Sequence, residues 1–397
     1  MAKDGESYSG VVRSRMTRHS GCDAACERTF CGSIEKKVSC PRRSDSSFSR
    51  DWMNRSVVAA MMNCLGFWDN ACGRSYRFDR FSPRLGRRMM SQSGFAGRDL
   101  VSIRDLSRAD MDHILDMAEV MEPLYRKGSD MLHGKIMATL FFEPSTRTKL
   151  SFESAMTKLG GTALGFAETK GTSVEKGENL ADTVRVVENY ADVLVVRHPL
   201  EGAARMAAEF SKTPVINAGS GAEEHPTQAL LDLYTMRKEL GKIDGLNIGL
   251  IGDLRYGRTV HSLAYALSQY KVNLFLVSPE ILKVRKEVLE EVSKRVDVKE
   301  TASLTQHLKE MDVIYMTRVQ KERFADLAEY EKVKGSYRLT MDELSKVKKS
   351  SIVMHPLPRV DEVDPAIDAT SHAKYFQQVG HGVVLRMALL ALLLGAM

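Results

Sequence analysis

The sequence predicts an α/β protein with two doubly wound parallel-sheet domains joined by interdomain helices. Three observations predict this fold. The 397 residues are enough for two domains with full cores. From residue 92 onward, short apolar segments alternate with amphipathic ones, which indicates parallel sheets with right-handed crossovers. Gly241 and Gly245 interrupt this alternation, and a second series of the same kind follows.

Each predicted element has a recognisable pattern. The first helix, 107–128, is amphipathic and begins with Ser107 as its N-cap. Strands are predicted at 135–142, 162–166, 192–199, 213–219, 246–253, 272–278, 298–301, 312–318 and 351–358, most of them apolar runs. Further helices are predicted at 146–160, 179–191, 202–211, 225–241, 258–270, 279–295 and 303–311. The C-terminal apolar run 387–397 is too short to span a bilayer, so we expect a buried helix there.

The chain consists of two unlike pieces. Residues 1–89 contain 17 Lys and Arg against 9 Asp and Glu, a net charge of +8, whereas the remainder has a net charge of −2. All six cysteines lie in the first piece, so the body uses neither a disulfide nor a thiol nucleophile. We expect an extension at 1–91, a first domain at 92–237 completed by a C-terminal helix at 381–397, and a second domain at 238–380.

The extension allows several interpretations. A transit peptide fits its arginines but not its nine acidic residues or its length. A zinc module at Cys22, Cys26, Cys31 and Cys40 lacks the paired C-x2-C spacing of such sites. We therefore interpret 1–91 as a disordered extension, or as the product of a start codon placed too early, with the real beginning at Met89 or Met90. No nucleic-acid or membrane partner is expected.

Polar clusters follow six of the predicted strands. They are Ser145 to Thr148, Arg197 to Pro199, His225 to Gln228, Arg255 to Thr259, Arg318 to Gln320, and His355 to Arg359. A single arginine at a strand end is usually a solvated charge or half of an ion pair. Because ligands of doubly wound sheets bind outside the carboxyl ends of the strands, six such clusters predict one site for anionic ligands.

The cluster Ser145-Thr146-Arg147-Thr148 has the chemistry of a phosphate site. A helix N-terminus has unpaired N–H groups and a partial positive charge, and three hydroxyls and a guanidinium add further donors. The alternative is a helix merely capped by Ser145, but that role needs one hydroxyl only. The turn is therefore predicted to bind phosphate.

Two other site types fit less well. The stretch from Gly252 to Thr259 is one residue from a Walker A loop, but Arg258 occupies the position of the lysine, which weakens a nucleotide triphosphatase hypothesis. His225 and Gln228 share a helix face, yet no further ligand has metal-site spacing, so His225 is expected to bind substrate by hydrogen bonds. No metal or cofactor is expected.

Together, these motifs resemble the catalytic chains of the aspartate carbamoyltransferase family. The resemblance covers residues 92–397 and is carried by FFEPSTRTKLSFE, VEKGENLADT, RHP, HPTQALLDL, GDLRYGRTVHSL, TRVQKER and HPLPRVDEV. Ornithine carbamoyltransferases share the S-T-R-T turn but typically carry an H-C-L-P segment and a serine–methionine–glycine motif. Here the corresponding stretches are H-P-L-P and TRVQ, which favour aspartate as the acceptor.

The resemblance implies a role for each site residue. It assigns Ser145, Thr146, Arg147 and Thr148 to the phosphate of carbamoyl phosphate, with Arg197, His225 and Gln228 at the carbamoyl group and backbone contacts from Leu357 and Pro358. It assigns Arg258, Arg318 and Gln320 to the carboxylates of L-aspartate. It places Lys176, with Ser173 beside it, in the active site of the neighbouring subunit of a homotrimer.

The implied reaction is carbamoyl transfer from carbamoyl phosphate to the amine of L-aspartate, an early step of pyrimidine biosynthesis in the cytoplasm. Regulatory chains in a larger assembly are compatible with the resemblance. Because the leaving group is already phosphate, no covalent enzyme intermediate is needed. Arg147, Arg197 and His225 are expected to stabilise the developing oxyanion, and the departing phosphate to accept the proton. A non-catalytic homologue would have lost one of these residues, and none is lost.

Overall fold

The computed structural model describes residues 94–321, 324 and 326–397. The interpretations of the extension at 1–91, its cysteines and the candidate start at Met89 or Met90 therefore lie outside the described residues.

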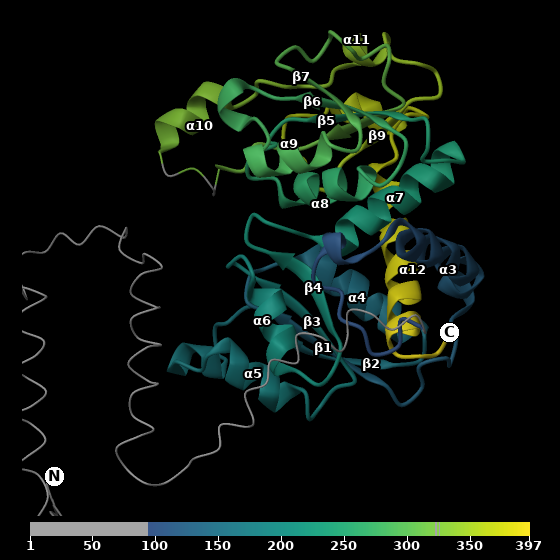
Figure 1. Ribbon diagram of the computed structural model, residues 1–397, viewed down its shortest axis with the longest axis vertical. Coiled ribbons are helices and arrows are strands. Elements are labelled where there is room, and N and C mark those ends of the chain that lie inside the picture. Colours follow the sequence, from purple (N-terminus) through teal and green to yellow (C-terminus); the bar gives the residue numbers. More distant parts are fainter. Residues whose placement is uncertain (1–93, 322–323, 325) are drawn as a thin grey trace, which may run out of the picture. The chain divides into compact units, whose positions relative to one another are not determined.

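Two parallel sheets form the framework of the described chain (Figure 1). The first lobe holds the sheet of β1 (Ile136–Phe141), β2 (Thr162–Phe166), β3 (Val193–His198) and β4 (Val215–Ser220), in the order β2-β1-β3-β4. The second lobe holds the sheet of β5 (Asn247–Ile251), β6 (Asn273–Val277), β7 (Asp297–Thr301), β8 (Val313–Met316) and β9 (Ile352–Met354), in the order β7-β6-β5-β8-β9. All ladders are parallel, which confirms the predicted fold class.

The strand order positions the site. In the first sheet the direction of winding changes between β1 and β3, and in the second it changes between β5 and β8. Ligands of such sheets bind at these switch points, beyond the carboxyl ends of the strands. Four of the predicted polar clusters lie at the carboxyl ends of these four strands: those that begin at Ser145, Arg255 and Arg318 follow β1, β5 and β8, and the one that begins at Arg197 starts within the last two residues of β3.

Helices cover both faces of the first sheet because its inner strands are apolar on both sides. Met137 and Phe141 of β1 pack toward α3 (Arg108–Lys127), α4 (Thr146–Lys158) and α12 (Tyr375–Leu393). Ala138 and Leu140 of the same strand pack toward α5 (Leu180–Val187) and α6 (Ala203–Phe210). This alternation follows from the two-residue period of a strand. It explains why every residue of the strand except Thr139 is apolar.

The second sheet is covered in the same way. Its first face packs on α8 (Arg258–Leu267) and α9 (Lys286–Val292). Its other face packs on buried side chains from the segments between β7 and β8 and after β8, including α11 (Met341–Leu344). The short helix α10 (Leu327–Val333) and the single turns η1 (Ile103–Asp105), η2 (Ser173–Lys176), η3 (Glu280–Leu282) and η5 (Pro365–Ala369) complete the described elements.

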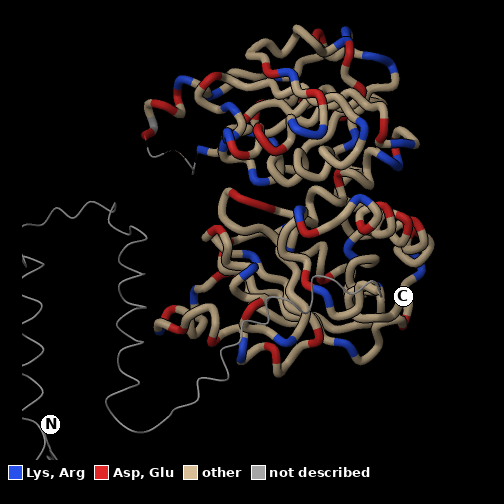
Figure 2. Tube along the Cα trace, viewed as in Figure 1, with Lys and Arg blue, Asp and Glu red and all other residues tan. Residues whose placement is uncertain are grey.

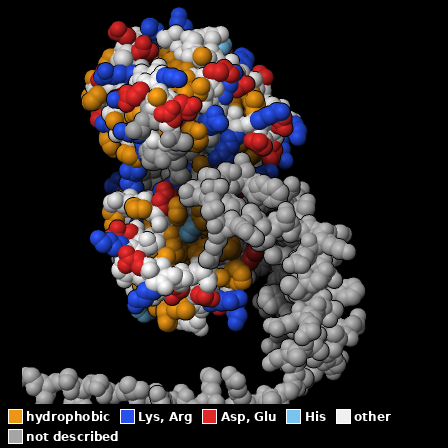
Figure 3. All heavy atoms as spheres, turned by 90° about the vertical axis from the view of Figure 1, so that its left-hand side faces the viewer, with side chains coloured by type: hydrophobic (Ala, Val, Ile, Leu, Met, Phe, Trp, Pro, Cys, Tyr) orange, Lys and Arg blue, Asp and Glu red, His pale blue; other side chains and the backbone are white. Residues whose placement is uncertain are grey.

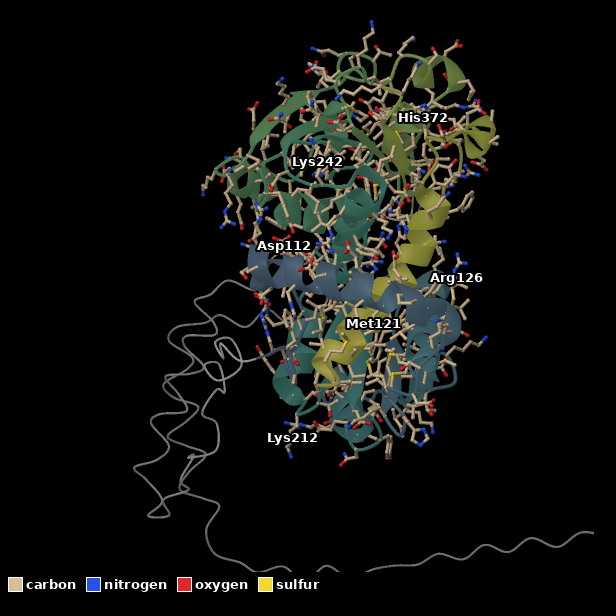
Figure 4. The ribbon with its side chains drawn as sticks, turned by 90° about the vertical axis from the view of Figure 1, so that its right-hand side faces the viewer. Asp112, Met121, Arg126, Lys212, Lys242 and His372 are labelled. Carbon is tan, nitrogen blue, oxygen red and sulfur yellow. The ribbon has the colours of Figure 1, made fainter. Side chains whose placement is uncertain are left out.

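Two long helices join the lobes. α7 (Pro226–Leu240) contacts β4 of the first lobe and α8 of the second, and α12 contacts α3, α4 and α7 as well as β9. Figure 4 shows α12 crossing α3, where the labelled Met121 is fully buried. One hydrophobic cluster runs through these helices into both lobes. The predicted interdomain helices are therefore present.

The C-terminal helix is longer than predicted. It begins at Tyr375 and, among the described helices, it alone is long and apolar enough to cross a membrane. The expectation that it is too short was therefore wrong, but most of it is buried inside the protein, as predicted. It is a core helix.

Two predicted helices are not formed as expected. Residues 303–311 are turns, because Ser303 N–H and Gln306 both bond to the Thr301 hydroxyl, a local side-chain competition with helical hydrogen bonds. The predicted helix 279–295 is broken between η3 and α9. Leu282 and Val284 are both buried there, and the extended backbone of Lys283 turns both inward. The sequence pattern also missed α10 and α11.

Acidic and basic residues are interspersed over both lobes (Figure 2). This mixture agrees with the small net charge of the body.

Candidate active site

A cavity of about 380 Å³ lies at the carboxyl ends of the strands, between the lobes. Twelve of the predicted site residues line it: Ser145, Thr146, Arg147, Thr148, Arg197, His225, Gln228, Arg258, Arg318, Gln320, Leu357 and Pro358. Among the described lining residues five are arginines and one, Glu143, is acidic. Figure 3 shows Lys and Arg side chains where the two lobes meet. The cavity is therefore suited to anions.

Three helix N-termini border the cavity without side-chain caps. The N-cap residues of α4, α7 and α8 are Ser145, His225 and Gly257, and none makes a capping side-chain hydrogen bond. Their N–H groups and partial positive charge remain available to a ligand. The alternative for Ser145, a hydroxyl used only to cap its helix, is not what the structure contains.

Arg147 reaches across the cavity to the second lobe. Its Nη2 donates to the carbonyl oxygen of Leu357 at 2.7 Å, while Thr148 is buried behind it. Burial, and then the positive charge of Arg318, lower the pKa of Arg147. Because Arg147 and Arg318 repel each other, an anion bound between them would offset the repulsion and be stabilised by both charges.

His225 is neutral at physiological pH. Burial, and then the charges of Arg197, Arg258 and Arg386, lower its pKa well below the usual value. Its backbone N–H donates to Ser262 Oγ at 2.8 Å, which fixes the start of α7. A neutral imidazole can donate one hydrogen bond to a carbonyl oxygen without carrying a proton to it.

Glu143 links the arginines of the two lobes. Its carboxylate accepts from Arg197 Nη2 at 3.3 Å and from Arg258 Nη1 at 2.9 Å. Arg197 also donates to Ala218 O, and Arg258 to Gly221 O. Sequence reasoning did not assign Glu143 a role, although it stands two residues before Ser145 in the first motif. The acidic residue in an otherwise anion-binding stretch was the available signal.

Gln320 is held in place by the loop that follows β5. Gln320 Nε2 donates to Tyr256 O at 3.2 Å, and its backbone N–H donates to Asp253 Oδ2 at 3.3 Å. Asp253 also accepts from Tyr256 N, and burial raises its pKa. The loops after β5 and β8 are thus joined behind the arginines that face the cavity.

The turn after β9 is held by a buried histidine. His355 Nδ1 accepts from Leu357 N at 2.8 Å, and its Nε2 donates to Glu362 at 2.6 Å. Burial lowers the pKa of His355. Gln378 of α12 accepts the His355 backbone N–H at 3.0 Å. These bonds hold the Leu357 carbonyl, which meets Arg147, at the cavity wall.

A buried polar network beneath the cavity was not predicted. Asp232 is fully buried, and burial raises its pKa to about 7. Arg386 of α12 is also buried, and burial lowers its pKa to about 10, so it remains charged. Its Nη1 donates to Ser151 Oγ and to Gly382 O. The signals were an aspartate four residues after Gln228 and an arginine within an apolar run.

Other predicted residues lie away from the cavity. Lys176 and Ser173 are exposed on η2 and do not line it. Arg255 is exposed and donates to Ile281 O, and Arg359 pairs with Asp368. No group of three or more potential metal ligands occurs among the described residues.

Gly219 should be sensitive to substitution because both Glu143-bound arginines pack against it. Its φ is +120°, and an added Cβ would lie 3.0 Å from Arg197 Nη1 and 3.2 Å from Arg258 Cζ. We expect Gly219→Ala to lower kcat/KM about tenfold or more, since small displacements of positioning groups cost that much. Gly241→Ala is the matched control, because Gly241 also has positive φ, with no atom near its Cβ. Equal activity loss in both variants would contradict this expectation.

Comparisons with known proteins agree with this geometry. Residues 98–238 match a family model described as the aspartate/ornithine carbamoyltransferase carbamoyl-P binding domain, and residues 244–393 match the Asp/Orn binding domain of the same family. The chain is 58% identical over 304 residues to the aspartate carbamoyltransferase catalytic subunit of Thermococcus kodakarensis, covering 76% of this chain and 98% of the relative.

Solved structures give the same result. The catalytic subunit of M. jannaschii aspartate transcarbamoylase is 50% identical, with a TM-score of 0.69, and the match covers 74% of this chain and 96% of that one. The Trypanosoma cruzi aspartate transcarbamoylase in complex with carbamoyl phosphate and aspartate is 41% identical, with a TM-score of 0.73, and the match covers 76% of this chain and 98% of that one.

Proposed function

Because the chain belongs to the aspartate/ornithine carbamoyltransferase family, we propose that it transfers the carbamoyl group of carbamoyl phosphate to the amine of L-aspartate. The products are N-carbamoyl-L-aspartate and phosphate, in pyrimidine biosynthesis. The observation that carries this proposal is the cavity in which five arginines and three uncapped helix N-termini meet. Two highly charged anionic substrates explain this density of positive charge.

The phosphate binds at the start of α4. Ser145, Thr146 and Thr148 supply hydroxyl donors, and the helix supplies backbone N–H groups. Arg147 adds a planar fork that matches phosphate oxygens. Its bond to Leu357 O leaves further N–H donors of the guanidinium for the ligand.

The carbonyl carbon is attacked directly by the amine of L-aspartate. A C–N bond forms, negative charge develops on the carbonyl oxygen, and the C–O bond to phosphate then breaks. Arg147, Arg197 and the neutral His225 supply donors for that oxygen, and one such donor is worth about 3–4 kcal/mol in comparable sites. The departing phosphate accepts the amine proton, so no protein general base is required. Holding both reactants together contributes about 7–11 kcal/mol.

The acceptor binds to the second lobe through its carboxylates. This part of the cavity is lined by Arg258, Arg318 and Gln320. The two arginines only donate hydrogen bonds, whereas the glutamine amide both donates and accepts. L-Aspartate has two carboxylates to match them, whereas ornithine has one carboxylate and a second cationic group. The charge of the wall therefore favours aspartate.

Arg318→Ala should act mainly through aspartate. Loss of one charged donor pair to a carboxylate is expected to raise the KM for aspartate about 10–10²-fold, with a smaller effect on the KM for carbamoyl phosphate. Initial rates at varied concentrations of each substrate measure this. Arg255→Ala is the matched control, an exposed arginine of the same lobe that does not line the cavity. Unchanged saturation by aspartate in Arg318→Ala would show that the carboxylates bind elsewhere.

The active unit is proposed to be a homotrimer in the cytoplasm. Lys176 is exposed and lies outside the cavity of its own chain, which fits a residue supplied to a neighbour, and Ser173 lies on the same turn. A cyclic trimer has heterologous interfaces, so each chain can give one residue and receive one. Regulatory chains are compatible with this arrangement. No cofactor is required by the proposed reaction.

The direct test is product formation by the purified full-length chain. With carbamoyl phosphate, we expect carbamoyl aspartate from L-aspartate and no citrulline from ornithine. Formation of citrulline alone would show that the acceptor is ornithine and not aspartate. Absence of both products, together with nucleotide hydrolysis that depends on Mg²⁺, would instead favour a nucleotide triphosphatase.

A further inference from the structure

Asp232 lies one helical turn beyond Gln228 and gathers hydrogen bonds from three elements. It accepts from Gln228 Nε2 on α7 at 2.9 Å, from Gln378 Nε2 on α12 at 2.6 Å and from the Tyr315 hydroxyl on β8 at 2.8 Å. The side chain is fully buried, and it does not line the cavity. It therefore acts on a ligand only through its neighbours.

The bonds to Asp232 determine how two amides are oriented. A carboxylate only accepts hydrogen bonds, so each glutamine must turn its Nε2 toward it. The Oε1 of Gln378 then accepts the His355 N–H at 3.0 Å. The Oε1 of Gln228, a half-buried residue of the cavity wall, becomes the amide atom available to the cavity. One buried carboxylate thus sets an acceptor in the wall and anchors the turn that carries Leu357.

We propose that Asp232 is a positioning residue for the carbamoyl group. By holding Gln228 Nε2, it presents Gln228 Oε1 as the acceptor for the NH₂ group of carbamoyl phosphate. The inference rests on the proposed function. A reversed amide would direct N–H donors at the NH₂ donors of the ligand and leave both without partners, which weakens binding.

The acceptor atom rather than the charge of Asp232 should matter. Both glutamine bonds end on Oδ1, whereas the Tyr315 bond ends on Oδ2. An asparagine whose oxygen takes the place of Oδ1 can keep both glutamines, with its amide nitrogen donating to the Tyr315 hydroxyl. Burial raises the pKa of Asp232 to about 7, so the surroundings stabilise its charge poorly. Leucine has the same shape but no acceptor.

Acetyl phosphate separates this role from a structural one. It carries a methyl group where carbamoyl phosphate carries NH₂, and the two share the phosphate. Calorimetric titration of the full-length chain gives both dissociation constants. In Asp232→Leu we expect carbamoyl phosphate to bind about tenfold more weakly and acetyl phosphate to change less than twofold. Asp232→Asn should retain the wild-type ratio, and so should the control Tyr315→Phe, which removes the third bond only.

Three outcomes would overturn the proposal. They are equal weakening of both ligands in Asp232→Leu, no change in the affinity for either ligand in that variant, or a changed ratio of the two dissociation constants in Asp232→Asn. If Asp232→Leu does not fold, Gln228→Met removes the amide at a half-buried position and must lower the same ratio; an unchanged ratio there also overturns the proposal. Failure of the proposed function looks different, because the wild-type chain would then form no carbamoyl aspartate.

Discussion

Arg147→Ala is expected to lower kcat about 10²–10³-fold or more. Arg147 lies in the first turn of α4, and its Nη2 donates to Leu357 O of the second lobe, so its side chain spans the cavity between the two lobes. Its loss removes a donor whose value increases as negative charge develops on the carbonyl and phosphate oxygens. Steady-state rates at saturating concentrations of both substrates measure the effect.

Arg147→Lys is the matched variant. A lysine keeps the positive charge but not the planar fork, so we expect activity between that of the alanine variant and the wild type. Near-normal kcat in Arg147→Ala, with only a raised KM for carbamoyl phosphate, would show that Arg147 binds the ground state and transition state equally. In that case its catalytic role would be wrong.

Lys176→Ala is expected to lower activity about 10²-fold in the homotrimer, the loss of one charged donor in a desolvated site. The distinctive result comes from mixing. If Lys176 serves a neighbour, then Lys176→Ala and Arg147→Ala chains unfolded and refolded together form hybrid trimers. Each hybrid combines an intact Arg147 with an intact Lys176 in one of its sites. About a quarter of the wild-type activity should return at equal mixing.

The control for this experiment is the same mixture without unfolding, which should stay as inactive as its parents if subunits do not exchange. A refolded mixture no more active than the mean of its parents would show that Lys176 is a solvated surface residue or serves its own chain. A site shared between subunits would then be excluded.

Residue patterns predicted the framework well because burial on both faces leaves a clear trace. β1 and the first four residues of β3 are almost entirely apolar, since their alternate side chains enter two different layers of helices. The N-terminal boundary of α7 was also readable, because Pro226 occupies its first turn. The polar clusters after these strands then located the cavity wall.

The errors came from features that depend on tertiary contacts. The break in 279–295 lies where the backbone of Lys283 turns Leu282 and Val284 to the same buried side, whereas a helix would place two such residues on nearly opposite faces. No role was predicted for Asp232 or Arg386 from the sequence. Their burial follows from the packing of α7 on α12. The place of Lys176 depends on a second chain, which a single sequence does not describe.

The central claim is that one cavity holds the phosphate and the dicarboxylate together. N-(phosphonacetyl)-L-aspartic acid, which the T. cruzi relative binds in another solved structure, joins both groups in one molecule. Calorimetric titration of this compound into the wild type, Arg147→Ala and Arg318→Ala tests the claim. We predict one molecule bound per chain and an affinity at least tenfold lower in each variant, since each removes one charged contact. Affinity unchanged in either variant would contradict a site in which both lobes hold one ligand.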